Sequence, residues 1–308
     1  MDRLENQILY DWVSITSKIH GTDDFIRILG FEKEGISFEL TKGAHGYHDR
    51  LYYDGISIHF NGREDMGIWL EMSGQGCRTF ESYGTGRFED LFEMVLSDPD
   101  EVHLTRLDIA FDDHTDVLDI DRICDDTEEQ EYVSRFKGWQ VTRSDGGNSV
   151  TLGSRSSEIL IRIYDKAAER GYDDGRHWVR CELQLRRDRA LAFINQQGTA
   201  GEVFKGVLLN YLRYVEPDAF DSNKWRWPLK TYWDNLCGSA QRIKLYSKPG
   251  VEYNMGNLER FVFEQAGNAI ATYQTIYGFA KFQERLKERG TQLNAKYSKL
   301  IRDYKSTK

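Results

Sequence analysis

The sequence contains four cysteines, four prolines and no long apolar run in 308 residues. The cysteines lie far apart and form no Cys-x-x-Cys pair, which argues against a structural zinc site and against a disulfide framework. A membrane-spanning helix needs about 18 or more consecutive apolar residues, and the sequence has no such stretch. The first residues also lack the basic start and apolar stretch of a signal peptide. We therefore expect a cytoplasmic protein with reduced thiols and no membrane partner.

Positive charge is scarce in the first part of the chain, although the net charge of the whole protein is only −9. Residues 1–132 contain 31 acidic and 11 basic residues, whereas residues 133–308 contain 19 acidic and 30 basic residues. This asymmetry favours one surface that repels polyanions and another that attracts them. Residues 281–308 contain 9 basic and 3 acidic residues, and an apolar stripe runs from Leu293 to Tyr304 at helical spacing. This segment could contact phosphates, pack in a homodimer or be a solvated helix.

The order of predicted elements indicates a repeated architecture. An apolar content of 40% with 13% aromatic residues is typical of a globular chain. A strand, a helix and several strands follow one another twice, beginning near Asp11 and near Leu104. We therefore predict an α+β fold in which two related halves share a central, mostly antiparallel sheet, within a catalytic and DNA-binding domain over residues 1–235. A helical C-terminal region is expected over residues 236–308, and the sheet domain should contain helices at 24–29, 88–96, 119–134, 188–197 and 202–214.

Three predicted strands each place polar, chemically capable side chains on one face. Alternate residues of a strand share a face, so each of these strands has a polar side and an apolar side. The polar residues are Arg106, Asp108 and Asp112 in the strand over 104–112, Arg162, Tyr164 and Lys166 in the strand over 160–166, and Arg180, Glu182, Gln184 and Arg186 in the strand over 178–186. If the three strands are neighbours in one sheet, these faces combine into one platform.

This platform would contain the groups that phosphoryl transfer on nucleic acid requires. The carboxylates of Asp108 and Glu182 suit a hard divalent cation, and an all-oxygen site favours Mg²⁺ or Mn²⁺ over Zn²⁺. Arginine and lysine bind phosphate oxygens, and a tyrosine hydroxyl is a potential nucleophile. Each carboxylate could instead balance a neighbouring arginine in an ordinary ion pair. Asp112 lies about 13 Å along the strand from Asp108, so it is the weaker ligand candidate.

Several blocks of the sequence, together spanning roughly residues 9 to 240, resemble the replication initiation factor family. This family includes rolling-circle plasmid and phage replication initiators and the relaxases of Gram-positive integrative conjugative elements. The blocks are Leu104-Thr-Arg-Leu-Asp-Ile-Ala-Phe-Asp-Asp113, Thr151-Leu-Gly-Ser-Arg-Ser-Ser157, Ile161-Arg-Ile-Tyr-Asp-Lys166, Arg180-Cys-Glu-Leu-Gln-Leu185, Asp11-Trp-Val-Ser-Ile-Thr16 and Ser73-Gly-Gln-Gly-Cys-Arg78. The resemblance implies an HUH-nuclease-like fold. The His-hydrophobe-His motif of those nucleases is absent from this sequence, and the family is expected to hold its metal ion with carboxylates.

The resemblance further implies a sequence-specific DNA nickase. Tyr164, the tyrosine of the Arg-x-Tyr-x-Lys block, would attack a DNA phosphate and leave a 5′-phosphotyrosine and a free 3′-hydroxyl. Lys166 belongs to the same block, and cations beside Tyr164 should make its phenolate less costly to form. Phosphate or DNA contacts are expected from Arg106, Arg155, Arg162, Arg180 and Gln184. The expected partners are single-stranded or hairpin origin DNA, a host polymerase and a host helicase, because no ATP-binding loop is found.

Other interpretations remain open from the sequence. Tyr172, Tyr211 and Tyr214 are alternative nucleophiles, although the spacing of Tyr211 and Tyr214 is also typical of core packing. A non-catalytic origin-binding protein could use the same fold with structural carboxylates. A palm-type nucleotidyl transferase is a third interpretation, because Asp108 together with Asp112 and Asp113 could mimic its paired acids.

Overall fold

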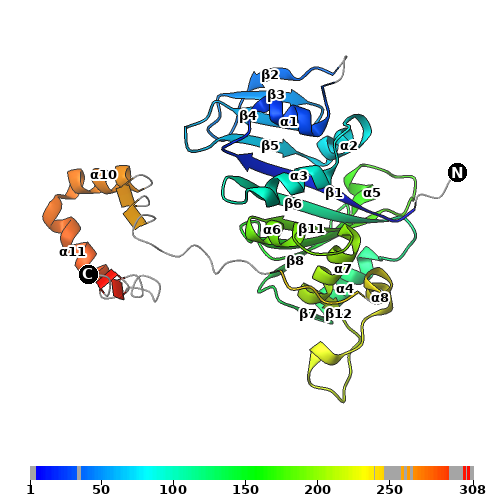
Figure 1. Ribbon diagram of the computed structural model, residues 1–308. Helices are drawn as coiled ribbons and strands as arrows, with labels where there is room; N and C mark the ends of the chain where they lie inside the picture. The colour runs from blue at the N-terminus through cyan, green and yellow to red at the C-terminus, as the bar shows by residue number, and fades with distance from the viewer. Residues whose placement is uncertain are drawn as a thin grey trace. The chain divides into compact units, whose positions relative to one another are not determined.

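The chain divides into two compact units, Met1–Ser247 and Lys248–Lys308, in this computed structural model (Figure 1). The structure describes residues 5–32, 36–238, 240–245, 258–259, 262–263, 266–290, 301–302 and 304–305. The boundary expected after residue 235 falls inside helix α8 (Thr231–Cys237), whose Trp233 and Leu236 are buried in the first unit. The division therefore lies further along the chain, because α8 belongs to the core of the first unit.

A ten-stranded sheet forms the centre of the first unit, and all its neighbouring strands pair antiparallel. The strand order is β2-β3-β4-β5-β1-β6-β11-β10-β9-β8. The strands are β1 (Gln7–Ser17), β2 (Glu39–Lys42), β3 (Asp49–Tyr53), β4 (Ile56–Phe60), β5 (Ile68–Met72), β6 (Val102–Asp113), β8 (Trp139–Thr142), β9 (Ser149–Leu152), β10 (Ile159–Asp165) and β11 (Val179–Arg186). A separate small sheet pairs β7 (Tyr132–Ser134) with β12 (Leu212–Tyr214).

The two halves of the large sheet have the same topology. β1 and β6 pair at the centre, β5 and β11 flank them, and each half then continues outward through three successive hairpin-connected strands. A helix follows each central strand, namely α1 (Thr22–Leu29) after β1 and α4 (Ile120–Glu128) after β6. Two further helices follow each flanking strand, namely α2 (Gly74–Tyr83) and α3 (Phe88–Ser97), and α6 (Asp188–Ile194) and α7 (Ala200–Tyr211). The predicted α+β fold with two related halves is confirmed.

These helices cover one face of the sheet, as Figure 1 shows. That face carries the apolar side of the strands, where Val13, Ile58, Ile109, Ile163 and Leu183 are fully buried in one core. Burying such a side chain contributes about 1.5–3 kcal/mol, so strand alternation decides which face the helices cover. The opposite face keeps the polar side chains of the same strands. Among the described residues, no helix is long and apolar enough to cross a membrane, and all four cysteines are buried free thiols.

Several helix predictions differ from the structure, and the helix expected over 188–197 ends at Ile194 as α6. The helix expected over 119–134 ends at Glu128, and residues Tyr132–Ser134 form β7 instead. The helix expected over 202–214 ends at Tyr211, because Leu212–Tyr214 pairs with β7 as β12. α2 was not predicted, because its first turn is glycine-rich. A Cβ on Gly76 would lie 2.2 Å from the Gly55 carbonyl oxygen, so close backbone packing requires glycine there.

The second unit contains α10 (Gly267–Tyr277) and α11 (Phe279–Gly290) among its described residues. These helices agree with the helical pattern expected after residue 258. Most of the stripe between Leu293 and Tyr304 lies outside the described residues, and only Ile301 and Tyr304 of its apolar members are described. The short α5 (Lys166–Glu169) and the 3-10 helix η1 (Lys224–Arg226) complete the elements of the first unit.

Candidate active site

The polar faces of β6, β11 and β10 are adjacent, because β11 lies between the other two strands. Arg180 is opposite Asp112 on one side and opposite Tyr164 on the other. One step along the strands, Glu182 is opposite Ala110 and Arg162. The platform predicted from the three strand faces is therefore formed on the sheet face that the helices leave open.

Tyr164 lies within this platform, and its hydroxyl lies between the carboxylate of Glu182 and the ammonium group of Lys166. The hydroxyl donates to Glu182 Oε2 at 3.2 Å and accepts from Lys166 Nζ at 3.4 Å. The Arg162 guanidinium lies 4.5 Å from the centre of the tyrosine ring. Only 4% of Tyr164 is exposed, and burial together with the charge of Glu182 raises the pKa of its hydroxyl. The charge of Arg180 lowers this pKa, as expected of a neighbouring cation, but burial and Glu182 outweigh it.

Lys166 reaches Tyr164 because the strand ends between them. Asp165, the last residue of β10, caps α5 by accepting from the Ala168 backbone N–H at 2.8 Å. Lys166 is consequently the first residue of α5, and its ammonium group also pairs with Glu169. The ammonium group is buried and in contact with the tyrosine oxygen, which is the position from which a cation can stabilise a phenolate.

Asp108 and Glu182 form a buried acidic pair. Burial, followed by the charge of Asp108, raises the pKa of Glu182 to about 7. Burial also raises the pKa of Asp108, although Arg106 donates to both of its carboxylate oxygens at 2.5–3.1 Å. The charges of Asp108 and Asp11 disfavour the ionised form of Glu182, and a divalent cation would relieve this repulsion, although Asp108 is already paired with Arg106. Asp108 and Glu182 are therefore the residues of this face that could hold a divalent cation.

Asp112, like Asp108, forms a two-point ion pair with an arginine, and its distance from the other two acids is what separates it from them. It accepts from Arg180 Nε at 2.6 Å and from Arg180 Nη2 at 2.7 Å, so its charge is already paired. The carboxylate oxygens of Asp108, Asp112 and Glu182 do not all lie within 4.8 Å of one another. This arrangement supports Asp112 as the anchor of Arg180 rather than as a third metal ligand.

Asp11 joins the site although strand alternation does not indicate it. In a regular strand Asp11 would share the apolar face of Val13, but the pairing of β1 with β6 shifts register between Tyr10 and Trp12. This β-bulge turns the Asp11 carboxylate toward Arg180, with 2.7 Å between Oδ1 and Nη1. The charge of Asp11 also raises the pKa values of Asp108 and Glu182. The signal in the sequence was the Asp11–Thr16 block itself, and the bulge was not detectable.

The remaining candidates lie in two groups. The Gln184 side chain contacts both Asp108 and Arg106, so these residues form one network beside the acidic pair. Arg106 also lies over the Trp12 ring at 4.2 Å. Arg155, in contrast, is exposed in the turn between β9 and β10. This turn precedes the start of β10, whereas Tyr164 lies near the other end of that strand. The structure therefore does not bring Arg155 to the tyrosine.

The alternative tyrosines lie elsewhere. Tyr214 is fully buried on the helix side of the sheet and bonds Thr127 at 2.7 Å. Tyr211 is buried as well, where it accepts from Arg189 at 3.0 Å. Tyr172 is 45% exposed and lies against Arg176 in the loop after α5. Tyr211 and Tyr214 are therefore core residues outside the platform, as the sequence spacing allowed, and Tyr172 is the exposed one of the three.

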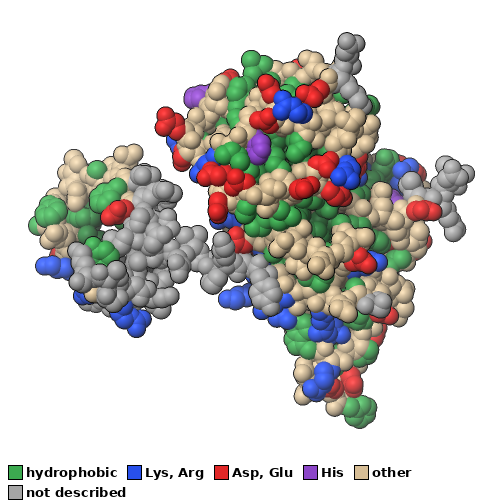
Figure 2. All heavy atoms as spheres, viewed as in Figure 1, with side chains coloured by type: hydrophobic (Ala, Val, Ile, Leu, Met, Phe, Trp, Pro, Cys, Tyr) green, Lys and Arg blue, Asp and Glu red, His purple; other side chains and the backbone are tan. Residues whose placement is uncertain are grey.

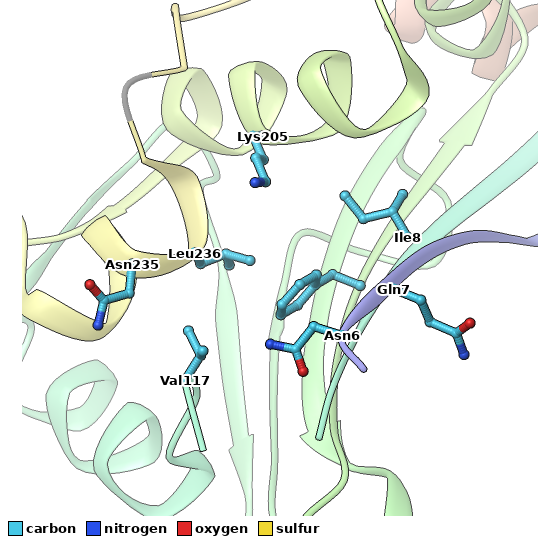
Figure 3. Close-up of a pocket in the computed structure, with 8 residues that line it drawn as sticks. Asn6, Gln7, Ile8, Val117, Lys205, Asn235 and Leu236 are labelled. Carbon is cyan, nitrogen blue, oxygen red and sulfur yellow. The ribbon is translucent and has the colours of Figure 1, made fainter. Parts of the chain in front are cut away.

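Two further features are separate from the polar face. Asp126, Glu129 and Glu131 have carboxylate oxygens within 4.8 Å of one another, but the buried Lys230 ammonium group pairs with Asp126 at 2.7 Å and with Glu131. A cavity of about 420 Å³ lies between the helices and the sheet, and Figure 3 shows Lys205 and Leu236 pointing into it beside Ile8. Neither feature contains a residue of the platform.

Comparisons with known proteins agree with this arrangement. Residues 102–289 match the family described as "Replication initiation factor", and residues 7–96 match the "Rolling Circle replication initiation protein N-terminal domain". The chain is 27% identical over 266 residues to "Putative DNA relaxase NicK" of Bacillus subtilis (strain 168), covering 80% of this chain and 74% of that protein. It also resembles the solved structure of a rolling circle replication initiator protein from Geobacillus stearothermophilus, with a TM-score of 0.69, 31% identity and coverage of 79% of this chain and 100% of the other. The chain thus belongs to the replication initiation factor family of rolling-circle initiators and relaxases.

Proposed function

We propose that this chain nicks and rejoins one strand of DNA, with Tyr164 as the nucleophile. The observation that carries the proposal is the contact of the Tyr164 hydroxyl with Glu182 at 3.2 Å and with Lys166 at 3.4 Å, on a sheet face that also carries Arg162 and Arg180. In the reaction, the tyrosine oxygen bonds to phosphorus as the bond to the 3′ oxygen breaks. The products are a 5′-phosphotyrosine and a 3′-hydroxyl, and the retained phosphoester makes rejoining possible without ATP.

Glu182 and Lys166 support the loss of the tyrosine proton. The hydroxyl already donates to Glu182, whose pKa of about 7 is suited to a general base near neutral pH. The Lys166 ammonium group then stabilises the phenolate through the contact that it already makes. This pairing offsets the cost that burial imposes on the charged tyrosine.

Asp108 and Glu182 are the residues that would hold Mg²⁺ or Mn²⁺, and Asp11 adds a third negative charge nearby. When bound, the cation would polarise the scissile phosphate and offset its growing negative charge. Arg180 is held by Asp11 and Asp112, which leaves it fixed on the platform beside Tyr164. Arg162 and Arg180 are suited to binding the phosphate groups on either side of the scissile bond.

The two rival functions have weaker support. A non-catalytic origin-binding protein does not need a tyrosine hydroxyl between a carboxylate and an ammonium group. The palm-type interpretation paired Asp108 with Asp112 and Asp113. Asp112 instead binds Arg180, and Asp113 points to the opposite side and accepts backbone N–H groups of Thr115 and Leu118. We further propose origin DNA as the substrate, a host helicase and polymerase as partners, and a homodimer as a potential assembly.

One gel distinguishes these functions. The full chain is incubated with Mn²⁺ and labelled single-stranded oligonucleotides tiled across the DNA next to its coding sequence, and the mixture is then denatured. Nicking by tyrosine predicts label attached to the protein, whereas simple DNA binding predicts none and a transferase requires added nucleoside triphosphates. Tyr164→Phe should lower the yield of the adduct by at least about 1,000-fold, and the matched control Tyr172→Phe should leave it unchanged. An adduct of normal yield in Tyr164→Phe would exclude Tyr164 as the nucleophile.

A further inference from the structure

The open face of the sheet continues beyond the site across the N-terminal half. Trp12 of β1 is opposite Asp108, which places it beside the acidic pair. Further out, one cross-strand row contains Arg50 of β3, His59 of β4 and Trp69 of β5. We call these four residues, Trp12, Arg50, His59 and Trp69, the aromatic strip.

The rings of the aromatic strip are organised by direct contacts. His59 and Trp69 stack at 4.5 Å with an interplanar angle of 18°. The exposed His45 packs edge-on against Trp69 at 5.4 Å. Trp69 itself is half-buried and donates from Nε1 to Ser14 Oγ at 2.6 Å, which fixes its ring on the sheet. Burial lowers the pKa of His59 to about 4, so its ring is neutral at neutral pH. His59 is itself buried, and it therefore supports the Trp69 ring from beneath.

The distribution of charge directs a polyanion toward this face. The first turns of α1 and α3 are acidic, with Asp23 and Asp24 in α1 and Glu89 and Asp90 in α3. Figure 2 shows acidic side chains on the side of the molecule that these helices cover. On the open face, Glu71 is near Arg50 and Arg106, which offset its charge. The acidic residues of α1 and α3 therefore repel nucleic acid from the helix side.

The internal repeat relates the position of the aromatic strip to that of the candidate active site. Because β1, β5 and β4 correspond in topology to β6, β11 and β10, the strip occupies the place that the acidic pair and Tyr164 occupy in the other half. The two regions meet where Arg106 lies over Trp12. From β10 to β3 the face extends about 29 Å at about 4.8 Å per strand, which is enough for several nucleotides.

We propose that the aromatic strip is a base-stacking platform for the single-stranded DNA that flanks the scissile phosphate. This inference rests on the proposed nicking function in one respect only, which is that the DNA strand crossing the face is the one that is cut. Stacking on aromatic side chains tolerates any base, so the platform would hold flanking nucleotides without reading their sequence. The arginines at each end, Arg50 and Arg106, would bind the phosphates between the stacked bases.

The test measures binding of a fluorescent oligothymidylate of about 18 nucleotides to the full chain without divalent cation, so that no cleavage occurs. Trp69→Ala should weaken binding about fivefold or more, the lower end of the contribution of one stacked base. Trp69→Phe keeps a ring and should stay within about twofold of the native chain. The control Trp139→Ala removes an exposed tryptophan of β8 and should leave the affinity unchanged.

A second variant probes the same face through its charge, so that the outcome does not depend on the folding of Trp69→Ala alone. Arg50→Gln keeps the size of a half-buried side chain and should lower the slope of log affinity against log salt by about 0.7. Unchanged affinity in Trp69→Ala with an unchanged slope in Arg50→Gln would overturn the platform, as would equal binding of a duplex of the same length. A covalent adduct of normal yield alongside that result would reject the platform and leave the nicking function intact. Strip-dependent binding without any adduct would reject only the nicking function.

Discussion

At the scale of single residues, Glu182 is the most informative side chain of the site. Its carboxylate accepts from Tyr164 and lies in the same buried environment as Asp108. The folded protein therefore contains a carboxylate that titrates near neutral pH in place of its ordinary value of 4.5. A buried carboxylate of this kind should lower the free energy of unfolding when it is ionised.

The pH dependence of stability follows from the raised pKa of Glu182. Between its unfolded pKa of 4.5 and its folded pKa of about 7, the folded state binds more protons than the unfolded state. The free energy of unfolding therefore falls as pH rises through this window. Glu182→Gln should raise the free energy of unfolding by roughly 1–3 kcal/mol at pH 8 and change it little near pH 5, as measured by urea unfolding without divalent cation. The control Glu93→Gln, on an exposed part of α3, should show no such difference between the two pH values. The same gain at both pH values would contradict the account.

Divalent cation should reverse this destabilisation. Mg²⁺ or Mn²⁺ at 100 times its dissociation constant stabilises the folded state by about 2.7 kcal/mol, which corresponds to several degrees in Tm. The double variant Asp108→Asn, Glu182→Gln should lose this shift in a thermal melt. Glu129→Gln, in the acidic cluster around Lys230, should keep it. A shift that survives the double variant and disappears in Glu129→Gln would place the ion in that cluster.

At the scale of elements, the bulge in β1 completes the site. It brings Asp11 to Arg180, which Asp112 already holds through two hydrogen bonds. Replacing Asp112 by Ala should lower the free energy of unfolding by about 3–5 kcal/mol, because a buried arginine loses its main partner. Asp11→Ala should cost less, since Asp112 still pairs with Arg180, but it should slow nicking by displacing the guanidinium group. Urea unfolding and nicking rates measure the two effects, with the exposed Asp173→Ala as the control. A larger loss of stability in Asp11→Ala than in Asp112→Ala would contradict this division of roles.

Strand alternation was enough to predict the polar face, and the reason is physical. Ile161, Ile163, Leu183 and Leu185 must face the helices, so Arg162 and Glu182 must face away from them. The two-fold order of elements likewise predicted the two halves of the sheet. Alternation could not predict Asp11, because a bulge breaks the period of two locally. It also could not give the pKa of Tyr164, which depends on burial by neighbouring strands, or the break after Tyr211, which depends on pairing with β7.

At the scale of the whole molecule, the charge asymmetry predicts a role for the C-terminal region. Truncation from Gly290 onward removes part of the basic segment 281–308. We expect lower DNA affinity and a salt slope reduced by about 0.7–0.9 for each phosphate group that the shortened chain no longer binds. Adduct formation on a saturating short oligonucleotide should change little, because the described site residues lie within Met1–Ser247. A change in sedimentation mass with an unchanged salt slope would instead assign this segment to a dimer interface.

The central claim is that Tyr164 forms the covalent bond to DNA, and peptide mapping tests it most directly. The adduct formed by the native chain with Mn²⁺ is digested with protease and nuclease, and mass spectrometry locates the residual nucleotide on the protein. The modified peptide should contain Tyr164, between Arg162 and Lys166, with the phosphate on the tyrosine oxygen. A nucleotide on Tyr172 or on any other residue, with Tyr164 unmodified, would contradict this claim.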